Sequence, residues 1–280
     1  MKRKVFHLTI VLFIIAVNLN AQEDPEFTTQ LMRSTYKIVG KDGNLGTGLL
    51  LFRPLDASPN LGFPILITAK HVLDSIQGDS VFIKLRKFEN EKFSTFPYWL
   101  KIRDHGKNLY TTHPSEDVAV MEVGQIPRKI DTSFLWIIFL ANDQMFEEAG
   151  ISPGTELSIF GYPYGIEYNE GFPILRGGKI ASYPLLPSKK YKTYLVDFEV
   201  FGGNSGGIVY YSFHGWKSKS GRTTSPVGYN YIIGLVIEQV LKPKNVKQDE
   251  NVYGKDRRVV IGVVLNSSYI IETINLLPKR

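Results

Sequence analysis

A serine set among glycines is the most informative feature of the sequence, in the segment Phe201-Gly202-Gly203-Asn204-Ser205-Gly206-Gly207. Glycines cost conformational entropy on folding and add nothing to a core, so a cluster of them suits a backbone that turns tightly and exposes its own N–H groups. Exposed N–H groups beside a serine are what the stabilisation of an oxyanion requires. The segment therefore indicates a nucleophilic serine, with a plain glycine-rich hairpin as the alternative.

A serine nucleophile needs a general base, and His71 is the histidine best placed to be one. It lies within the stretch 65–73, at the end of an apolar strand, where a rigid element could hold an imidazole at the rim of a core. His105 and His113 lie in polar stretches and are predicted to be ordinary surface residues. His214 lies beside a glycine in an expected loop. We therefore assign the base to His71.

An acid that orients the imidazole is expected at Asp117, whose carboxylate opens the apolar strand 118–123. Asp74 and Glu116 remain competing carboxylates, and Asp74 could cap the turn after His71 instead. The serine segment also fits the G-x-S-x-G elbow of α/β-hydrolases, but that fold places its acid and its histidine after the serine. The order here is histidine, aspartate, serine, so the hydrolase elbow is rejected.

The composition is that of a globular protein. Of 280 residues, 43% are hydrophobic and 21% are charged, which is enough apolar surface for one large or two small packed domains and excludes wholesale disorder. The absence of cysteine excludes disulfides, thiolate metal sites and cysteine nucleophiles. No H-E-x-x-H or clustered His/Asp set is present, so we expect neither a metal nor a cofactor.

The first residues have the order of a secretory signal. Residues 2–4 are basic, 8–17 are apolar, and small and polar residues follow, so we expect a signal peptide over 1–21 with cleavage after Ala21. This predicts export to the periplasm or the extracellular space, with no stable membrane insertion afterwards. An uncleaved membrane anchor is the alternative, although the apolar run is short for a bilayer.

Signal removal also lowers the net charge. The segment holds three of the 33 basic residues and none of the 27 acidic ones, so the mature chain carries 30 − 27 = +3 rather than +6. A nucleic-acid partner would need a dense basic face, and only 217–222 comes near one. We interpret those residues as a solvated loop and expect no nucleic-acid partner.

Short runs rich in Val, Ile, Phe and Tyr recur between turn clusters, which predicts an all-β sandwich or barrel. About six strands are expected in each half, over 36–39, 47–52, 64–68, 81–85, 98–102 and 118–123, and then over 156–160, 178–181, 194–200, 207–211, 231–236 and 259–264. A short helix could lie within 142–149. An amphipathic closing helix is expected over 266–277, with Ser267 as a possible cap.

Three motifs together resemble the trypsin-like serine peptidases of the chymotrypsin fold, namely Thr68-Ala69-Lys70-His71-Val72, Asp117-Val118-Ala119-Val120 and Gly203-Asn204-Ser205-Gly206-Gly207. Gly46-Thr47-Gly48 and the stretch 158–163 are similar to the opening strands of the family's two barrels. The resemblance covers about 36–277. It implies two six-stranded antiparallel β-barrels, over 22–130 with His71 and Asp117 and over 131–280 with Ser205 and the closing helix.

The resemblance also implies a role for each site residue. Ser205 would attack the carbonyl carbon, His71 would take and return the proton, and Asp117 would hold the imidazole tautomer. The backbone N–H groups of Gly203 and Ser205 would form the oxyanion hole. Asn204 departs from the aspartate of animal digestive members, so activation by a processed N-terminus is not expected. The chain looks closer to the bacterial high-temperature-requirement peptidases, although control by a PDZ module, common in that family, is not expected.

Specificity is expected to depend on Glu199, because in this family the residue six before the nucleophile often lines the floor of the primary pocket. Ile237, Gln239 and Gly262 would be its walls. A carboxylate there would favour Arg or Lys side chains. The alternation in 197–200 leaves open that Glu199 simply faces solvent.

The sequence therefore predicts a secreted or periplasmic serine endopeptidase whose partner is a polypeptide substrate. The alternative is a catalytically silent peptidase fold that serves as a binding module of the cell envelope. A loop over 212–228 could border the cleft.

Overall fold

The computed structural model describes residues 26–279 except 57, 125, 128, 220–222 and 240–260. The predicted signal peptide over 1–21 lies outside the described residues. Within them, no helix is long and apolar enough to span a bilayer. The same ranges contain no group of three or more His, Asp or Glu side chains that could hold a metal ion.

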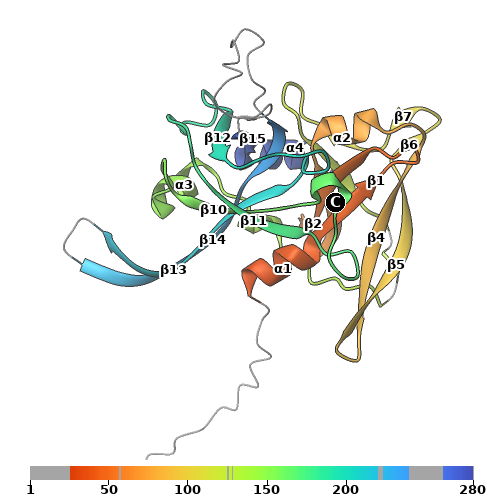
Figure 1. Ribbon diagram of the computed structural model, residues 1–280, viewed down its shortest axis with the longest axis horizontal. Helices are drawn as coiled ribbons and strands as arrows, with labels where there is room; N and C mark the ends of the chain where they lie inside the picture. Colours follow the sequence, from red (N-terminus) through yellow and green to blue (C-terminus); the bar gives the residue numbers. More distant parts are fainter. Residues whose placement is uncertain are drawn as a thin grey trace, which may run out of the picture.

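The first sheet has seven antiparallel strands in the order β5-β4-β1-β2-β3-β9-β8 (Figure 1). Its strands are β1 (Thr35–Val39), β2 (Leu45–Leu55), β3 (Ser58–Thr68), β4 (Ser80–Glu89), β5 (Lys92–Lys101), β8 (Thr111–Thr112) and β9 (Ala119–Glu122). The two edges approach each other where the Leu109 N–H donates to the Ile102 carbonyl at 2.9 Å. β6 (Arg103–Asp104) and β7 (Lys107–Asn108) form a separate small ribbon between those points.

The second sheet has six antiparallel strands in the order β11-β10-β13-β14-β15-β12. Its strands are β10 (Glu156–Gly161), β11 (Ile174–Lys179), β12 (Thr193–Asp197), β13 (Ile208–Lys219), β14 (Thr223–Gln239) and β15 (Ile261–Asn266). Ile180, directly after β11, bridges Val196 in β12, so the two outer strands of this sheet meet. Both sheets are thus barrel-like.

In the described ranges, four α-helices flank the sheets: α1 (Phe27–Ser34), α2 (Lys70–Ser75), α3 (Asp143–Ala149) and α4 (Ser267–Asn275). Two 3-10 turns, η1 (Ile137–Phe139) and η2 (Pro163–Gly165), lie in the connections. The side chains of Asn142 and Asn266 cap α3 and α4 by accepting backbone N–H bonds. The cap of the closing helix is therefore Asn266, and the expectation of Ser267 was wrong.

The prediction of an all-β fold with two barrel-like antiparallel sheets and a C-terminal helix is confirmed, as in a chymotrypsin-like double β-barrel. The first sheet has seven strands rather than six. The expected loop over 212–228 was wrong, because most of it forms the paired ends of β13 and β14, which extend away from the body as a hairpin (Figure 1). The division of the chain at 130 and 131 remains a prediction.

The two sheets share one hydrophobic core. A single cluster of buried residues includes Leu49 and Ile67 of the first sheet together with Ile208 and Leu235 of the second. A second cluster, which includes Val209 and Ile233, fills the interior of the second sheet. Because the sheets pack directly on each other, loops from both are held in fixed relation along their junction.

Candidate active site

His71 and Asp117 meet at one end of the first sheet. His71 lies in the first turn of α2, directly after β3, and Asp117 lies just before β9. β3 and β9 are paired with Thr68 opposite Ala119, so His71 and Asp117 lie at the same end of these two strands. The imidazole Nδ1 lies 2.6 Å from one Asp117 oxygen, and the backbone N–H of His71 donates to the other at 2.9 Å. The carboxylate thus holds both the ring and the backbone of the histidine.

This pairing changes both pKa values in opposite directions. The hydrogen bond to Asp117 raises the pKa of His71, against the lowering effect of burial, and the negative charges of Asp74 and Glu238 raise it further. Burial alone would raise the pKa of Asp117, but the hydrogen bonds from the His71 ring and backbone hold it below its ordinary value. An ionised Asp117 beside the imidazole is what a histidine base needs to accept a proton.

The two competing carboxylates are bonded elsewhere. Asp74 accepts a hydrogen bond of 2.6 Å from the Tyr110 hydroxyl. Glu116 pairs at 2.5 Å with Lys192, the residue directly before β12. In the described part of the chain neither is hydrogen-bonded to the imidazole, which leaves Asp117 as the carboxylate in contact with it.

The segment that carries Ser205 is tied to the first sheet through Thr47 of β2. The Thr47 N–H donates to the Ser205 carbonyl at 2.8 Å, and the Thr47 hydroxyl donates to the Gly203 carbonyl at 2.7 Å. On the other side, the Gly206 N–H donates to the Val236 carbonyl at 2.8 Å. The serine loop is therefore anchored on both sheets at once.

Gly206 shows how closely this loop approaches the segment before His71. Its φ is +82°, a conformation that side chains disfavour, and a Cβ here would lie 2.0 Å from the Thr47 carbonyl and 2.4 Å from the Thr68 hydroxyl. The same position is 3.2 Å from the backbone nitrogen of Ala69. Because Ala69 is two residues before His71, the structure brings the neighbourhood of the serine to the end of β3 that carries the histidine.

Two backbone N–H groups beside the serine are free. Over the described ranges, neither the Gly203 nor the Ser205 N–H has an acceptor within the protein. Gly203 has a φ of +94°, and a Cβ here would lie 2.2 Å from the Tyr162 carbonyl, so only glycine fits. Unpaired amides of this kind are unusual in a buried turn and are suited to a ligand oxyanion.

The Ser205 hydroxyl itself has no hydrogen bond, to His71 or to another described side chain. In enzyme structures without a ligand, hydrogen bonds between catalytic groups are often long and tighten only when substrate binds. The structure therefore brings together the histidine and the aspartate directly, and the serine through its loop.

The predicted specificity residues lie around Gly262 of β15. A Cβ here would lie 3.0 Å from the Val200 side chain and 3.4 Å from the Phe198 ring, and both of these residues are buried. Glu199 between them is half-buried, and its carbonyl accepts a bond of 2.8 Å from Arg176. The surroundings of Gly262 are thus apolar, and a pocket role for Glu199 remains a prediction.

The segment 237–239 runs beside them on β14. Ile237 is half-buried and packs against the core that the two sheets share. The backbone of Gln239 pairs with Gly262. Glu238 is exposed, and it is the residue of this segment whose charge reaches His71. Sequence reasoning missed Glu238, because nothing in the linear order relates it to the histidine.

His113 was predicted to be a surface residue, and that was wrong. It is only 8% exposed, and its Nδ1 accepts the backbone N–H groups of Ser115 and Glu116 at 3.2 and 3.1 Å. Its Nε2 lies 3.2 Å from Glu272 of α4. His113 therefore shapes the turn that leads to Asp117, and its partner 159 residues away gave no local signal.

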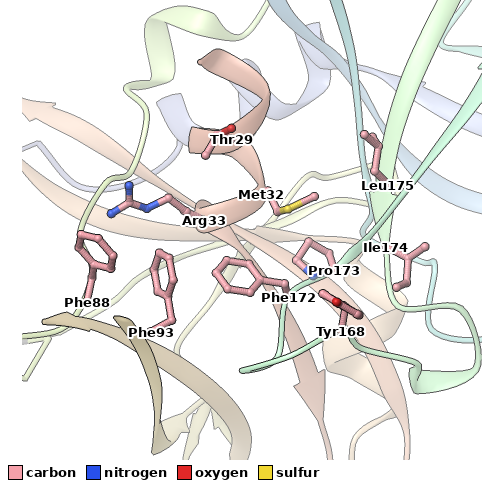
Figure 2. Close-up of a pocket in the computed structure, with 10 residues that line it drawn as sticks. All are labelled: Thr29, Met32, Arg33, Phe88, Phe93, Tyr168, Phe172, Pro173, Ile174 and Leu175. Carbon is pink, nitrogen blue, oxygen red and sulfur yellow. The ribbon is translucent and has the colours of Figure 1, made fainter. Parts of the chain in front are cut away.

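An apolar cavity of about 430 Å³ lies away from this site, between α1, the tip of the β4–β5 hairpin and the segment 168–175 (Figure 2). Its lining consists of Thr29, Met32, Arg33, Phe88, Phe93, Tyr168, Phe172, Pro173, Ile174 and Leu175. None of the candidate site residues lines it.

No protein-family model and no curated protein matches the sequence. Among solved structures, the chain is similar to a crystal structure of the Rv3671c protease in an inactive form. The identity is 17% and the TM-score is 0.45, and the match covers 91% of this chain and 94% of that chain. We therefore infer function from this chain's own residues and contacts.

Proposed function

We propose that the protein is a serine endopeptidase that acts through His71, Asp117 and Ser205. The observation that carries the proposal is the junction of the two sheets. An imidazole bonded to a carboxylate at 2.6 Å lies on one side, and a serine loop with two free amides is tied to the same edge from the other. A general base, its orienting acid, a hydroxyl and oxyanion donors are the parts that acyl transfer requires.

The reaction follows from these groups. The Ser205 oxygen attacks the scissile carbonyl carbon as His71 Nε2 accepts the hydroxyl proton, and Asp117 stabilises the imidazolium. The Gly203 and Ser205 N–H groups receive the oxyanion, each contributing about 2.7 to 4 kcal/mol. His71 then returns its proton to the leaving amine, which gives an acyl-enzyme. Water, activated by the same imidazole, releases the acid and restores the serine.

We propose that the chain acts on polypeptides after export, because the predicted signal over 1–21 directs it out of the cytosol. The test incubates the mature chain with an unfolded protein and identifies new peptide termini by mass spectrometry. Cleavage that a fluorophosphonate inhibitor stops supports an endopeptidase. Retention of the unfolded protein without new termini would instead indicate a silent binding module and contradict the proposal.

Replacing Glu238 with glutamine is expected to shift the acidic limb of the kcat/KM profile to lower pH. The Glu238 charge raises the pKa of His71, and a base must be neutral to act, so activity rises with pH through that pKa. Removing the charge lowers the pKa and allows activity at lower pH. The plateau should change by less than about fivefold, since an exposed charge pair is worth at most about 1 kcal/mol.

The matched control is Asp197→Asn, which removes the same charge from an exposed position of β12. Its profile should overlay that of the unaltered protein. A limb that moves to higher pH in Glu238→Gln, or equally in both variants, would contradict the assignment of His71 as the base.

Replacing Glu199 with glutamine is expected to reduce kcat/KM for substrates with Arg or Lys before the cleaved bond by about tenfold to a hundredfold. A hydrogen bond to a charged group is worth roughly 1.5 to 3 kcal/mol, and the amide retains only part of it. Substrates with aliphatic side chains should be unaffected. A peptide library that shows small or aliphatic preference in the unaltered protein would reject a pocket role for Glu199.

A further inference from the structure

The peptide that joins Gly202 to Gly203 is held by a turn in a different loop. The Tyr164 N–H donates to the Gly202 carbonyl at 2.7 Å. In a planar trans peptide, the C=O and the N–H point in opposite directions. A bond that fixes the Gly202 carbonyl therefore also fixes the direction of the Gly203 N–H, which is one of the two free amides beside Ser205.

The turn that supplies this N–H is strained and needs outside support. Tyr164 has a φ of 53°, and Gly165 after it has a φ of +73°. A non-glycine residue in the left-handed region costs free energy and persists only where its surroundings enforce it. Within the turn, the Gly165 N–H donates to the Tyr162 carbonyl at 2.8 Å, and the Tyr164 ring packs on Phe201 with 4.7 Å between centroids.

The first sheet supplies the outside support through charges. Lys37 of β1 donates to the Gly165 carbonyl at 3.0 Å and lies 2.5 Å from one carboxylate oxygen of Glu167. Lys84 of β4 pairs with the other oxygen. The three side chains are partly buried, with 18%, 32% and 24% exposure for Lys37, Lys84 and Glu167. Two strands of the first sheet thus hold the turn, through the Gly165 carbonyl and through the carboxylate of Glu167 two residues later.

In this ion triad of Lys37, Glu167 and Lys84, the two lysines favour the ionised form of the Glu167 carboxylate. Burial alone would raise the pKa of Glu167, but its close contacts with the positively charged Lys37 and Lys84 hold it below its ordinary value. Partly buried ion pairs with two partners lose less to solvent screening than isolated surface pairs. The carboxylate is therefore a fixed anchor at neutral pH.

We propose that Glu167 is a positioning residue for the oxyanion site, acting with Lys37 and Lys84. The triad fixes the turn, the turn's Tyr164 N–H fixes the Gly202 carbonyl, and the Gly203 N–H is thereby aimed at the position of the developing oxyanion. This inference rests on the proposed peptidase function. The first sheet would then contribute in two ways. It places the base His71, and through the ion triad it also orients the Gly203 N–H of the serine loop.

The test compares Glu167→Gln with the unaltered protein, normalised to active sites titrated with a fluorophosphonate. Removing one oxyanion donor costs about 10²–10³ in kcat. A donor that is kept but points in a wrong direction is expected to lower kcat by about tenfold. KM should stay within about twofold. The affinity of a peptide boronate, which uses the oxyanion site, should fall by about the same tenfold factor, whereas a non-covalent product peptide should bind equally well.

The matched control is Glu156→Gln, which removes an exposed ion pair between Glu156 of β10 and Lys179 of β11. It should leave all four quantities unchanged. A second pair of variants covers the case in which Glu167→Gln folds poorly. Lys37→Met is expected to reproduce the tenfold loss, and Lys37→Arg to rescue it, because arginine keeps the charge and the donors.

The outcomes are distinguishable. A loss of kcat and boronate affinity with unchanged product binding supports the inference. If the fluorophosphonate titrates the unaltered protein, but kcat and boronate affinity are unchanged in both Glu167→Gln and Lys37→Met, the inference is overturned and the proposed function stands. A wild-type chain that the fluorophosphonate does not label at Ser205 overturns the proposed function and this inference with it.

Discussion

Replacing Ser205 with alanine is expected to lower kcat for peptide hydrolysis by about 10⁶, the loss found when a serine peptidase loses its nucleophile. The variant keeps the backbone amides and the histidine but has no oxygen to form the acyl-enzyme. The hydrogen bond from Thr47 is accepted by the backbone carbonyl of Ser205, which the variant keeps. The loop should therefore remain in place, and the melting temperature should hardly change. The measurement is kcat on a chromogenic peptide beside a thermal melt.

Ser212→Ala provides the matched control for this result. Ser212 lies on β13 and donates to the side chain of Asn230 at 2.8 Å, so the same hydroxyl is removed from an exposed position. Its kcat should equal that of the unaltered protein. Comparable hydrolysis by Ser205→Ala would mean that another group attacks the carbonyl, which would end the assignment.

Replacing Asp117 with asparagine is the second large effect, and kcat is expected to fall by about 10⁴. Both carboxylate oxygens accept bonds from His71, one from the ring and one from the backbone N–H. An amide can keep only one of these bonds, and its NH₂ group favours the imidazole tautomer that cannot accept the serine proton. The loss should appear in kcat more than in KM, since the aspartate does not contact substrate.

The control for this prediction is Asp74→Asn, three residues from the histidine. Its carboxylate bonds to Tyr110 and influences His71 only through its charge. We expect less than about fivefold change in the plateau, with the acidic limb shifted to lower pH. Equal losses in the two variants would show that charge near the imidazole matters and that the direct bond does not.

Most of the strand pattern could be predicted from the sequence, because alternating apolar residues fix which face of a strand is buried. In β4, the buried residues Val81, Ile83 and Leu85 alternate with more exposed ones, as the pattern requires. The approach of His71 and Asp117 is also a local consequence, since both flank strands that pair. The ends of β13 and β14 were not predictable, because their polar and glycine-rich residues have the composition of a loop.

The helix α1 could not be predicted, and its stability is tertiary. Its sequence is short and includes two threonines in the first turn, which are poor helix formers. Phe27 and Leu31 are buried in the shared core. Arg86, fully buried, donates to the carbonyls of Arg33 and Thr35 at 2.8 and 2.7 Å, which satisfies the end of the helix. Packing from distant strands thus decides a segment whose own propensity is weak.

The ion triad beside the candidate site could not be predicted for the same reason, because it depends on contacts between distant parts of the chain. Glu167 meets Lys84 across 83 residues, and Lys37 reaches the Gly165 carbonyl across 128. Charged residues at such separations have no pattern that links them before the sheets pack. The motifs identify which residues would react, whereas the contacts that aim them depend on the junction between the sheets.

The most direct measurement is the site and pH dependence of fluorophosphonate labelling of the native mature chain, read by peptide mapping. We predict a single adduct on Ser205, formed at a rate that increases with pH through a pKa above the ordinary 6.5 of histidine, and lost in His71→Ala. An unlabelled Ser205, or labelling that proceeds equally fast without His71, would contradict the central claim that an imidazole beside the first sheet activates a hydroxyl in a loop of the second.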